Sequence, residues 1–361
     1  LILTGVILLA IIIDLFIDKS KSGYIGWVLM IGLIFVSGAV YVQEERITTL
    51  FSDAIALDPF ASFFKLVVVL ATILVSVASL HSDELKKYRK GEYFALLGIV
   101  TLGLFLMVSA VDLIMVYLSV EIVSIMSFIL AGYLKQNTRS NEAGLKYVIY
   151  GAFSSGVMLF GLSILYGLTG STNYFQIQQA ISLLDPETNT ALILSLLMIL
   201  AGFGYKISAV PFHFWTPDVY EGAPTPVTAF FAAAPKIAAM ALFLRVLLGP
   251  FHDLLAQWDQ IIVFISIASM ALGAFAAIGQ KNIKRLIAYS SIGHIGYALV
   301  GLAAGTPEGV RGVLIYLAIY MVMSLGTFAC ILAMRRRGQM VERIEDLSGL
   351  SKTNPAIALA L

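Results

Sequence analysis

The sequence feature that most constrains the fold is a succession of long apolar runs joined by short polar connections. Each run is long enough to cross the hydrocarbon core of a bilayer as a helix that rises about 1.5 Å per residue. We predict spans at residues 1–17, 24–42, 62–80, 92–109, 112–134, 142–168, 189–218 (interrupted), 226–248, 259–279, 284–304 and 311–334. Because 59% of the residues are hydrophobic and only 12% are charged, a soluble domain is excluded. The sequence thus predicts an all-α, polytopic membrane helix bundle.

We expect this bundle to form a single membrane domain over residues 1–361. The chain begins at Leu1, and a further apolar run begins near residue 354, a few residues before Leu361. We therefore expect a fragment of a longer protein, in which a twelfth span continues past the last residue.

The charged residues between the runs alternate between two sides of the predicted membrane. Most of the 23 Lys and Arg residues, Arg337 among them, fall in one set of loops, and the opposite set carries acidic residues such as Asp185 and Glu187. Because Lys and Arg accumulate in cytoplasmic loops, we expect the basic side to face the cytoplasm or the mitochondrial matrix. One exception is the basic-side loop after the interrupted run, which contains Asp218 and Glu221 but no Lys or Arg. The net charge of +1 gives no indication of a nucleic-acid partner.

The sequence contains no sign of a redox centre. Cys330 is the single cysteine, so the chain can form neither an internal disulfide nor the ligand set of an iron–sulfur cluster. Of four histidines, only His213 and His294 lie within or beside apolar runs, which is too few for a two-haem membrane cytochrome. The sequence has no P-loop and no dinucleotide-binding glycine pattern. We expect this chain to bind no cofactor and no metal.

The interrupted run at residues 189–218 combines a charge with a helix breaker. Lys206 lies near its middle, where a charged side chain costs roughly 2.5–3.5 kcal/mol on insertion scales. Pro211 cannot donate a hydrogen bond to the carbonyl of Ile207, so the helix should be interrupted there. Interrupted helices at membrane depth are tolerated where they line a cavity or are buried in protein. The combination predicts an ion-handling site.

Two more ionisable residues lie deep within predicted spans. Lys236 lies near the middle of its run and directly follows Pro235, which predicts a second irregular helix. Glu121 is the nearest candidate for a carboxylate partner, and it shares one helix face with Tyr117 and Ser124. In pumps, intramembrane ionisable groups usually serve proton relays. The alternative is a static Lys–Glu pair that only orders the helices.

The remaining candidates are closer to the ends of spans. Glu142 and Lys146 have the favourable i,i+4 spacing, either as a solvated surface pair or as the mouth of a polar path. Lys65 and Arg245 lie about one turn from span ends, so we expect their side chains to reach the interface. His294 is interpreted as a hydrogen-bonded core histidine in preference to a proton carrier, although it stays a candidate relay residue.

The motifs around these residues resemble the antiporter-like membrane subunits of respiratory complex I. The similarity is carried by the segments Ser119–Ser124, Glu142–Tyr147, Lys206–Pro226, Pro235–Ala238 and Asn282–His294. It extends over nearly the whole chain, and the segment from Trp215 to Pro226 resembles one of the paralogous subunits in particular. The resemblance implies inverted repeats of five helices, each with a broken helix. The first would span residues 92–248, and the second, incomplete here, residues 259–361.

The resemblance also implies roles for individual residues. Glu121 matches the glutamate of the family's fifth helix, Lys206 the lysine of the first broken helix, and Lys236 the relay lysine of the next helix. Another lysine, on a second broken helix, is expected beyond Leu361. The implied activity is proton translocation driven by quinone reduction in other subunits, so that the chain is a non-redox subunit of a translocase, NADH:quinone oxidoreductase.

The resemblance places the cofactors and partners outside this chain. NADH, FMN, iron–sulfur clusters and quinone would be bound by partner subunits. The direct partners would be other membrane subunits of complex I, including paralogous antiporter-like subunits, and the lipid bilayer. The location would be a bacterial inner membrane, with the mitochondrial inner membrane also compatible. Two alternatives stay open: a subunit of a related cation/proton antiporter, and a scaffold whose buried charges only fix helix packing.

Overall fold

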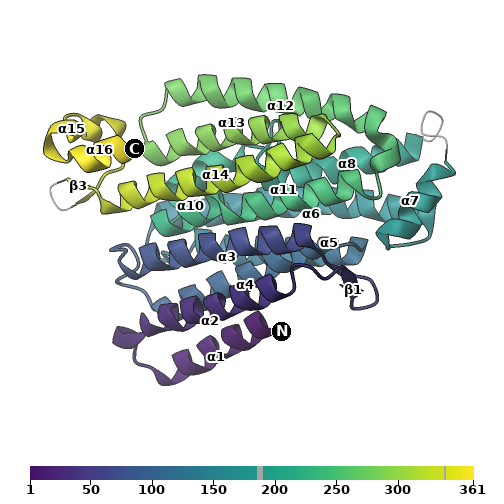
Figure 1. The fold of residues 1–361 in the computed structure, drawn as a ribbon. Helices are drawn as coiled ribbons and strands as arrows, with labels where there is room; N and C mark the ends of the chain where they lie inside the picture. The colour runs from purple at the N-terminus through teal and green to yellow at the C-terminus, as the bar shows by residue number, and fades with distance from the viewer. Residues whose placement is uncertain (185–189, 337–338) are drawn as a thin grey trace.

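The chain folds into a bundle of long helices that run side by side (Figure 1). The computed structural model describes residues 1–184, 190–336 and 339–361. Its helices are α1 (Ile2–Phe16), α2 (Tyr24–Val42), α3 (Pro59–Leu80), α4 (Lys90–Ser109), α5 (Leu113–Ala131), α6 (Thr138–Thr169), α7 (Tyr174–Ser182), α8 (Thr190–Ile207), α9 (Trp215–Gly222), α10 (Thr225–Ala232), α11 (Ala234–Leu248), α12 (Leu255–Ile278), α13 (Ile283–Ala303), α14 (Pro307–Ala333), α15 (Leu350–Thr353) and α16 (Pro355–Ala360). Single 3-10 turns are η1 (Lys19–Lys21), η2 (His252–Leu254) and η3 (Ile344–Leu347). The short strands β1 (Thr48–Leu50) and β2 (Ile55–Leu57) pair with each other, as do β3 (Arg335–Arg336) and β4 (Gln339–Met340).

The predicted class of fold, a polytopic helical membrane bundle, is confirmed. Over the described ranges, 10 helical segments are long and apolar enough to cross a membrane, with α10 and α11 counted as one. The run predicted at residues 1–17 forms α1, which has only 15 residues and rises about 22 Å, less than the roughly 30 Å of a bilayer core. Asp185, Glu187 and Arg337, which the charge pattern assigns to opposite sides, lie outside the described residues.

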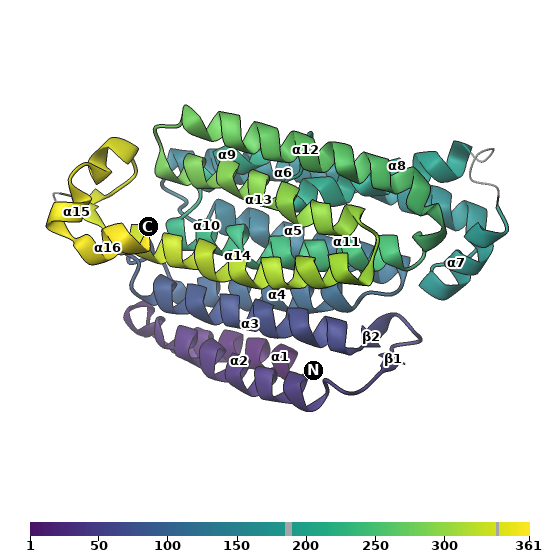
Figure 2. The same ribbon diagram turned by 45° about the horizontal axis from the view of Figure 1, so that its top comes forward.

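The connections gather at two ends of the bundle, as Figure 2 shows, with the β1–β2 hairpin and α7 at one end and α15 and α16 at the other. We call the end with α15 and α16 the basic end, because the Lys- and Arg-rich connections lie there. Contacts between distant segments establish this grouping: Arg335 bridges to Asp83 at 2.9 Å. At the opposite, acidic end, Arg245 contacts Asp58. The alternating charge pattern of the sequence therefore corresponds to two physical ends.

Side-chain caps fix where several helices begin. The carboxylate of Asp58 accepts a hydrogen bond from the backbone N–H of Ala61, and α3 therefore starts at Pro59, earlier than the apolar run suggests. Asn137 likewise accepts from the N–H of Arg139 at the start of α6. Such caps satisfy backbone groups that a helix end leaves unpaired, which extends these helices beyond their apolar segments.

Two of the crossing helices are interrupted, as the sequence predicted. The first, α8, ends at Ile207, where Ser208 adopts a left-handed conformation with φ of 64° and the chain runs without helix to α9. The helix therefore stops before Pro211, and the N–H of Ala209 closes its end on the carbonyl of Gly204 at 2.8 Å. The second interruption falls at Ala233, between α10 and α11 (φ −111°, ψ −84°).

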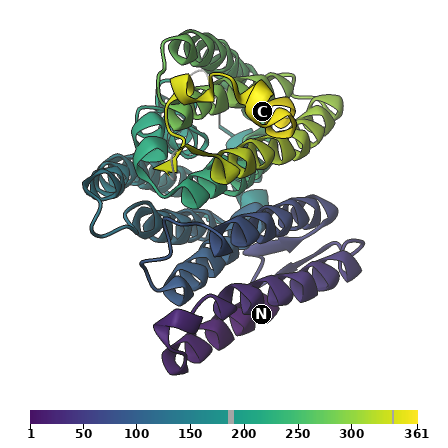
Figure 3. The ribbon, with the colours of Figure 1, turned by 90° about the vertical axis from the view of Figure 1, so that its left-hand side faces the viewer.

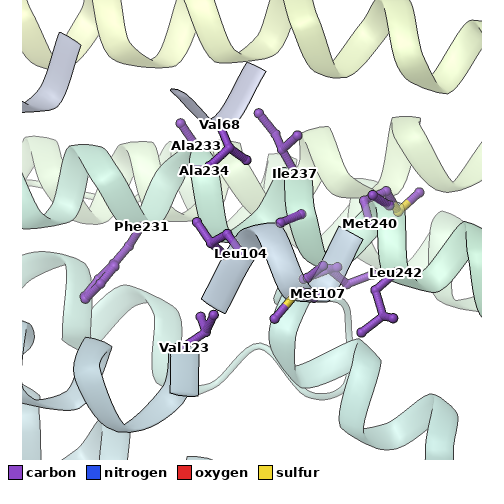
Figure 4. Close-up of a cluster of buried hydrophobic side chains, with 14 of the residues drawn as sticks. Val68, Leu104, Met107, Val123, Phe231, Ala233, Ala234, Ile237, Met240 and Leu242 are labelled. Carbon is purple, nitrogen blue, oxygen red and sulfur yellow. The ribbon is translucent and has the colours of Figure 1, made fainter. Parts of the chain in front are cut away.

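The α10–α11 segment forms the centre of the bundle. Within its most apolar 18-residue stretch, 94% of the residues are buried, against 28–61% for the other crossing segments, so it is enclosed by protein on nearly all sides. The end-on view in Figure 3 places it between the N-terminal helices and α12–α14. The close-up in Figure 4 shows Val68, Leu104 and Met107 of α3 and α4 around Ile237 and Met240 of α11. A charge on this segment therefore lies in the protein interior rather than in lipid.

Candidate functional site

Lys206 lies in the last turn of α8, directly before the interruption, and its side chain is buried. The ammonium donates a hydrogen bond to the hydroxyl of Ser124 on α5. Ser124 lies one turn from Glu121 on the same helix face, as the sequence predicted. Glu121 therefore lies one helical turn from the residue that binds the ammonium. The described part of the chain nevertheless contains no ion pair between the two residues within 4.0 Å, and one carboxylate oxygen of Glu121 is buried without a hydrogen-bond partner there.

Lys236 lies in the first turn of α11, directly after the interruption at Ala233, and is only 1% exposed. Its ammonium donates to the hydroxyl of Ser291 on α13 at 2.6 Å. The ammonium also lies 5.1 Å from the ring centroid of Tyr220, a cation–π contact. Both deep lysines therefore adjoin a helix interruption, and both donate to a serine hydroxyl.

A polar chain continues from Lys236 toward α14. The hydroxyl of Ser291 is 2.7 Å from that of Tyr320. The ring of Tyr320 lies against that of His294, with 5.1 Å between centroids, and Nδ1 of His294 is 2.6 Å from the hydroxyl of Tyr316. His294 is therefore hydrogen-bonded as expected, but it is half-buried rather than part of the core, and it lies beside the same polar chain.

The segment between the two lysines contains buried polar atoms that have no hydrogen-bond partner within the described residues. They belong to Ser208 and His213 of the interruption and to Thr216 and Tyr220 of α9. Buried polar groups in native interiors are almost always hydrogen-bonded, and ordered water often provides the partner. The interruption thus supplies polar groups suited to holding water between α8 and α11. Predicting them from the sequence would have required the path of the chain after Pro211.

Aromatic packing and one hydrogen bond hold α9, the helix that follows the interruption, in place. The indole N–H of Trp215 donates to the carbonyl of Tyr205 at 3.0 Å. The Trp215 ring stacks on Tyr147 of α6, with centroids 4.4 Å apart and planes inclined by 9°. These contacts join α6, α8 and α9, so the interruption is a fixed feature of the packing.

The predicted pair of Glu142 and Lys146 is confirmed at 2.8 Å, and it belongs to a larger cluster at the basic end. Lys146 also contacts Asp218 of α9 at 2.6 Å, and Arg285 of α13 contacts both Asp218 (2.6 Å) and Glu221 (3.1 Å). These residues line a cavity of about 300 Å³. Burial raises the pKa of Asp218, but the hydrogen bonds and charges of Lys146 and Arg285 outweigh it, and the pKa lies below its ordinary value.

The sequence had assigned Arg285 only to a basic loop and had not identified the partners of Asp218 and Glu221. A signal was present, because these two carboxylates break the charge pattern of their side. Acidic residues in a loop on the basic side of the membrane indicate that basic residues from another segment pair with them. The structure supplies them from helices that lie 72 and 67 residues away along the chain.

Lys65 and Arg245, which we expected to reach the interface, have side chains that are largely covered by protein. The side chain of Arg245 is 12% exposed. Its guanidinium forms two hydrogen bonds with the carboxylate of Asp58, at 2.8 and 3.0 Å, and a third with the carbonyl of Val108. Lys65 is buried on the neighbouring α3. Burial raises the pKa of Asp58. The hydrogen bonds and the charge of Arg245 lower it by more, so the pKa lies below its ordinary value. Asp58, the capping residue of α3, lies beside α11 at the acidic end, and its carboxylate takes the place of water around the guanidinium of Arg245.

Within the described ranges, no three His, Cys, Asp or Glu side chains are grouped closely enough to hold a metal ion.

Comparison with known proteins defines the class to which this fold and site belong. Residues 110–361 match the family described as "NADH:quinone oxidoreductase/Mrp antiporter, TM". The chain is therefore a member of the antiporter-like membrane subunits shared by these two kinds of complex. Among its relatives, subunit N 1 of NADH-quinone oxidoreductase from Rhizobium meliloti is 53% identical over 92% of this chain and 69% of the relative. Subunit N from Azorhizobium caulinodans is 49% identical over 96% of this chain and 72% of the relative.

Within that class, the chain belongs to the family of NADH-quinone oxidoreductase subunit N, also called chain 2, which is the paralogue that the segment from Trp215 to Pro226 resembles. Solved structures agree on the fold. A chain of respiratory complex I from Thermus thermophilus superposes with a TM-score of 0.78 at 26% identity, over 99% of this chain and 75% of that one. A chain of the Mrp complex from Dietzia superposes with a TM-score of 0.81 at 22% identity, over 99% of this chain and 68% of that one, and this likeness concerns the fold alone.

Proposed function

We propose that this chain translocates protons through a relay of Glu121, Lys206 and Lys236, driven by quinone reduction in other subunits of NADH-quinone oxidoreductase. One observation carries the proposal. The ammonium groups of Lys206 and Lys236, the buried lysines that adjoin the two helix interruptions, each donate to a serine hydroxyl, and neither has a carboxylate within 4.0 Å in the described part of the chain. A hydroxyl can accept from a charged ammonium and donate to a neutral amine. Serine partners therefore suit a lysine that changes protonation, whereas a tight carboxylate pair would hold it charged.

In this relay, Glu121, which lies one helical turn from the serine that Lys206 binds, controls the charge of Lys206. Charges couple strongly in a medium of low dielectric constant, so neutralising Glu121 weakens the hold on the Lys206 proton. The proton then passes toward Lys236 through water held by the polar groups of the interruption. Ser291, Tyr320 and the neighbouring His294 continue the polar path beyond Lys236.

Glu142 and Lys146 form the mouth of this path at the basic end. The cavity beside them opens among charged side chains, and α9 connects it to the interruption. In the same proposal, residues 92–248 are the first five-helix repeat and residues 259–361 the beginning of the second. The interruption after Ile207 would then be the broken helix of the first repeat.

The rest of the proposed assembly lies in partner subunits. They supply NADH oxidation on FMN, the iron–sulfur clusters and the quinone site, and they include paralogous antiporter-like subunits. We place the complex in a bacterial inner membrane, because the relatives described above are bacterial proteins.

The test is proton pumping by the assembled complex in vesicles, measured per electron from NADH. Lys206→Met removes the ammonium, and pumping per electron should fall while the complex still assembles. Lys65→Met is the matched control, since it removes another buried lysine that lies outside the relay. Normal pumping per electron by an assembled Lys206→Met complex rules the relay out. If the variant changes only thermal stability, the scaffold alternative is correct.

A second candidate is a subunit of a cation/proton antiporter, because the Mrp complex shares the fold. Identities of about 50% to oxidoreductase subunits, against 22% to the Mrp chain, favour the first candidate. Purification from the native membrane distinguishes them. Co-purification with flavin and iron–sulfur subunits supports the oxidoreductase, and cation/proton exchange by a complex that lacks those subunits supports the antiporter.

A further inference from the structure

A pocket at the basic end has an excess of positive charge. It has a volume of about 300 Å³ and lies between the turn after α1, the start of α4 and the connection from α5 to α6. Its charged lining residues are Lys19, Lys87, Arg89, Lys135 and Glu92. Three segments that are distant in sequence thus bring four basic side chains and one acidic side chain to one small space.

The three lysines of this pocket differ from other basic residues nearby. Over the described residues, Lys19, Lys87 and Lys135 form no ion pair and no side-chain hydrogen bond. By contrast, Lys86 and Arg335 are both paired with Asp83. The ammonium groups of the pocket are therefore available to an anion.

The other polar groups fix the shape of the pocket and add a donor. Arg89 is held by Asp14, with Nε 2.9 Å from a carboxylate oxygen, so its charge is largely compensated. The hydroxyl of Tyr133 donates to the carbonyl of Arg89. The hydroxyl of Tyr88 accepts from the N–H of Gln136 at 3.4 Å, which leaves its own proton free to donate into the pocket. Ammonium groups and an O–H group converging on one space suit a phosphate.

The surroundings indicate what carries the phosphate. The last turn of α1, which leads into Lys19, exposes Leu15 and Phe16, the latter at 86%. Tyr24, also exposed, begins α2 on the other side of the same turn. In Figure 1 this turn lies at the left-hand end of α1 and α2, and the two helices continue from it along the outside of the bundle. Exposed apolar helix surface thus adjoins a basic pocket at the end of the bundle that the charge pattern assigns to the cytoplasmic interface.

We propose that this pocket binds the phosphate of an anionic phospholipid, with Lys19, Lys87 and Lys135 around the headgroup and the acyl chains along the exposed faces of α1 and α2. Basic pockets between membrane helices on the cytoplasmic side are suited to such headgroups. The proposal is independent of the proton relay, because none of these residues belongs to it.

The test uses the intact complex reconstituted with a photoactivatable phosphatidylglycerol, followed by mass-spectrometric mapping of cross-linked peptides. Cross-links should fall on residues 17–23, 81–89 and 132–137 and should be displaced by phosphatidylglycerol but not by phosphatidylcholine. Each lysine near the surface contributes about a fivefold factor in affinity, so the triple variant Lys19→Gln/Lys87→Gln/Lys135→Gln should bind about a hundredfold more weakly.

The matched control removes the same charge from the same end but outside the pocket, with Lys21→Gln/Lys281→Gln/Lys352→Gln, and it should cross-link as the wild type does. Equal losses in both triple variants would reduce the effect to general surface charge and overturn the proposal. Displacement by inorganic phosphate as effectively as by phosphatidylglycerol would identify a free-anion site and overturn the lipid assignment. If the pocket variant does not assemble, the three single variants carry the same test at about fivefold each.

Discussion

Arg245 and Asp58 form a bidentate ion pair between α11 and α3, with nitrogen–oxygen distances of 2.8 and 3.0 Å, although 187 residues separate them in sequence. The pair anchors the acidic end of α11, the helix whose other end carries Lys236. Lys236 and Arg245 lie on the same short helix but face different neighbours, α13 and α3. One helix thus has a firmly paired charge at one end and a hydroxyl-bound charge at the other.

Arg245→Ala should destabilise the bundle strongly, because it leaves the Asp58 carboxylate partly buried without its partner. Removing one member of a buried pair costs about 3–5 kcal/mol. The exposed pair of Arg139 and Glu342, at 3.4 Å and with side chains 69% and 48% exposed, provides the comparison, and Arg139→Ala should cost less than about 1 kcal/mol. Thermal unfolding of the purified complex measures both changes. Equal losses from the two variants would contradict the role of burial.

Ser291→Ala should impair proton transfer at Lys236, because it removes the hydroxyl that accepts from the ammonium. A hydrogen bond to a charged group contributes about 1.5–3 kcal/mol. Its loss should therefore slow proton transfer at Lys236 by about tenfold to hundredfold. Ser291→Thr keeps a hydroxyl and should retain most of the activity. Ser266→Ala is a control, since within the described residues that buried serine bonds to the carbonyl of Gly296 and to no ionisable group. Proton pumping per electron in vesicles is the measurement, and unchanged pumping by Ser291→Ala speaks against the path.

Acidification should loosen α9 through Asp218. The pKa of this carboxyl is lowered in the folded protein from its ordinary value of 3.8, so its contribution to stability is complete above that value. The contribution is lost as the pH falls below 3.8 toward the folded pKa, where Asp218 is protonated and its contacts with Lys146 and Arg285 weaken. Thermal unfolding between pH 3 and 6 should therefore depend on pH more steeply in the wild type than in Asp218→Asn. Parallel curves would contradict this prediction.

Gly273→Ala should separate α12 from α13. A Cβ atom at this position would lie 2.6 Å from the backbone nitrogen of Gly293 and 2.8 Å from the carbonyl oxygen of Tyr289, and backbone atoms cannot move aside cheaply. Gly156→Ala in α6 is the control, because a Cβ there meets nothing within 4 Å and alanine favours the helix by about 0.5–1 kcal/mol. Thermal stability should fall in the first variant and stay equal or rise in the second. A stable Gly273→Ala bundle would show that the two helices tolerate separation.

The sequence by itself determined the membrane-spanning class and the two interruptions. Hydropathy is additive along a run, so the spans follow from local composition. The helix-breaking residue Pro211 and the charge of Lys206 are likewise properties of one short segment. Start positions were less certain: α3 and α6 begin several residues earlier than their apolar runs, because Asp58 and Asn137 cap them.

The tertiary structure alone decided which groups meet. Glu121, Lys206 and Lys236 could be selected from the sequence because a charge at membrane depth is costly wherever it occurs. The sequence placed Ser124 beside Glu121 but could not pair it with Lys206, and it gave no reason to choose Ser291. Many serines lie in apolar helices, and only the rotation and packing of the helices determine which one faces an ammonium. The same holds for Arg245, whose partner Asp58 is 187 residues away in sequence. Burial cost is a property of a residue and its local run, whereas the compensation for that cost depends on neighbours that only folding brings into contact.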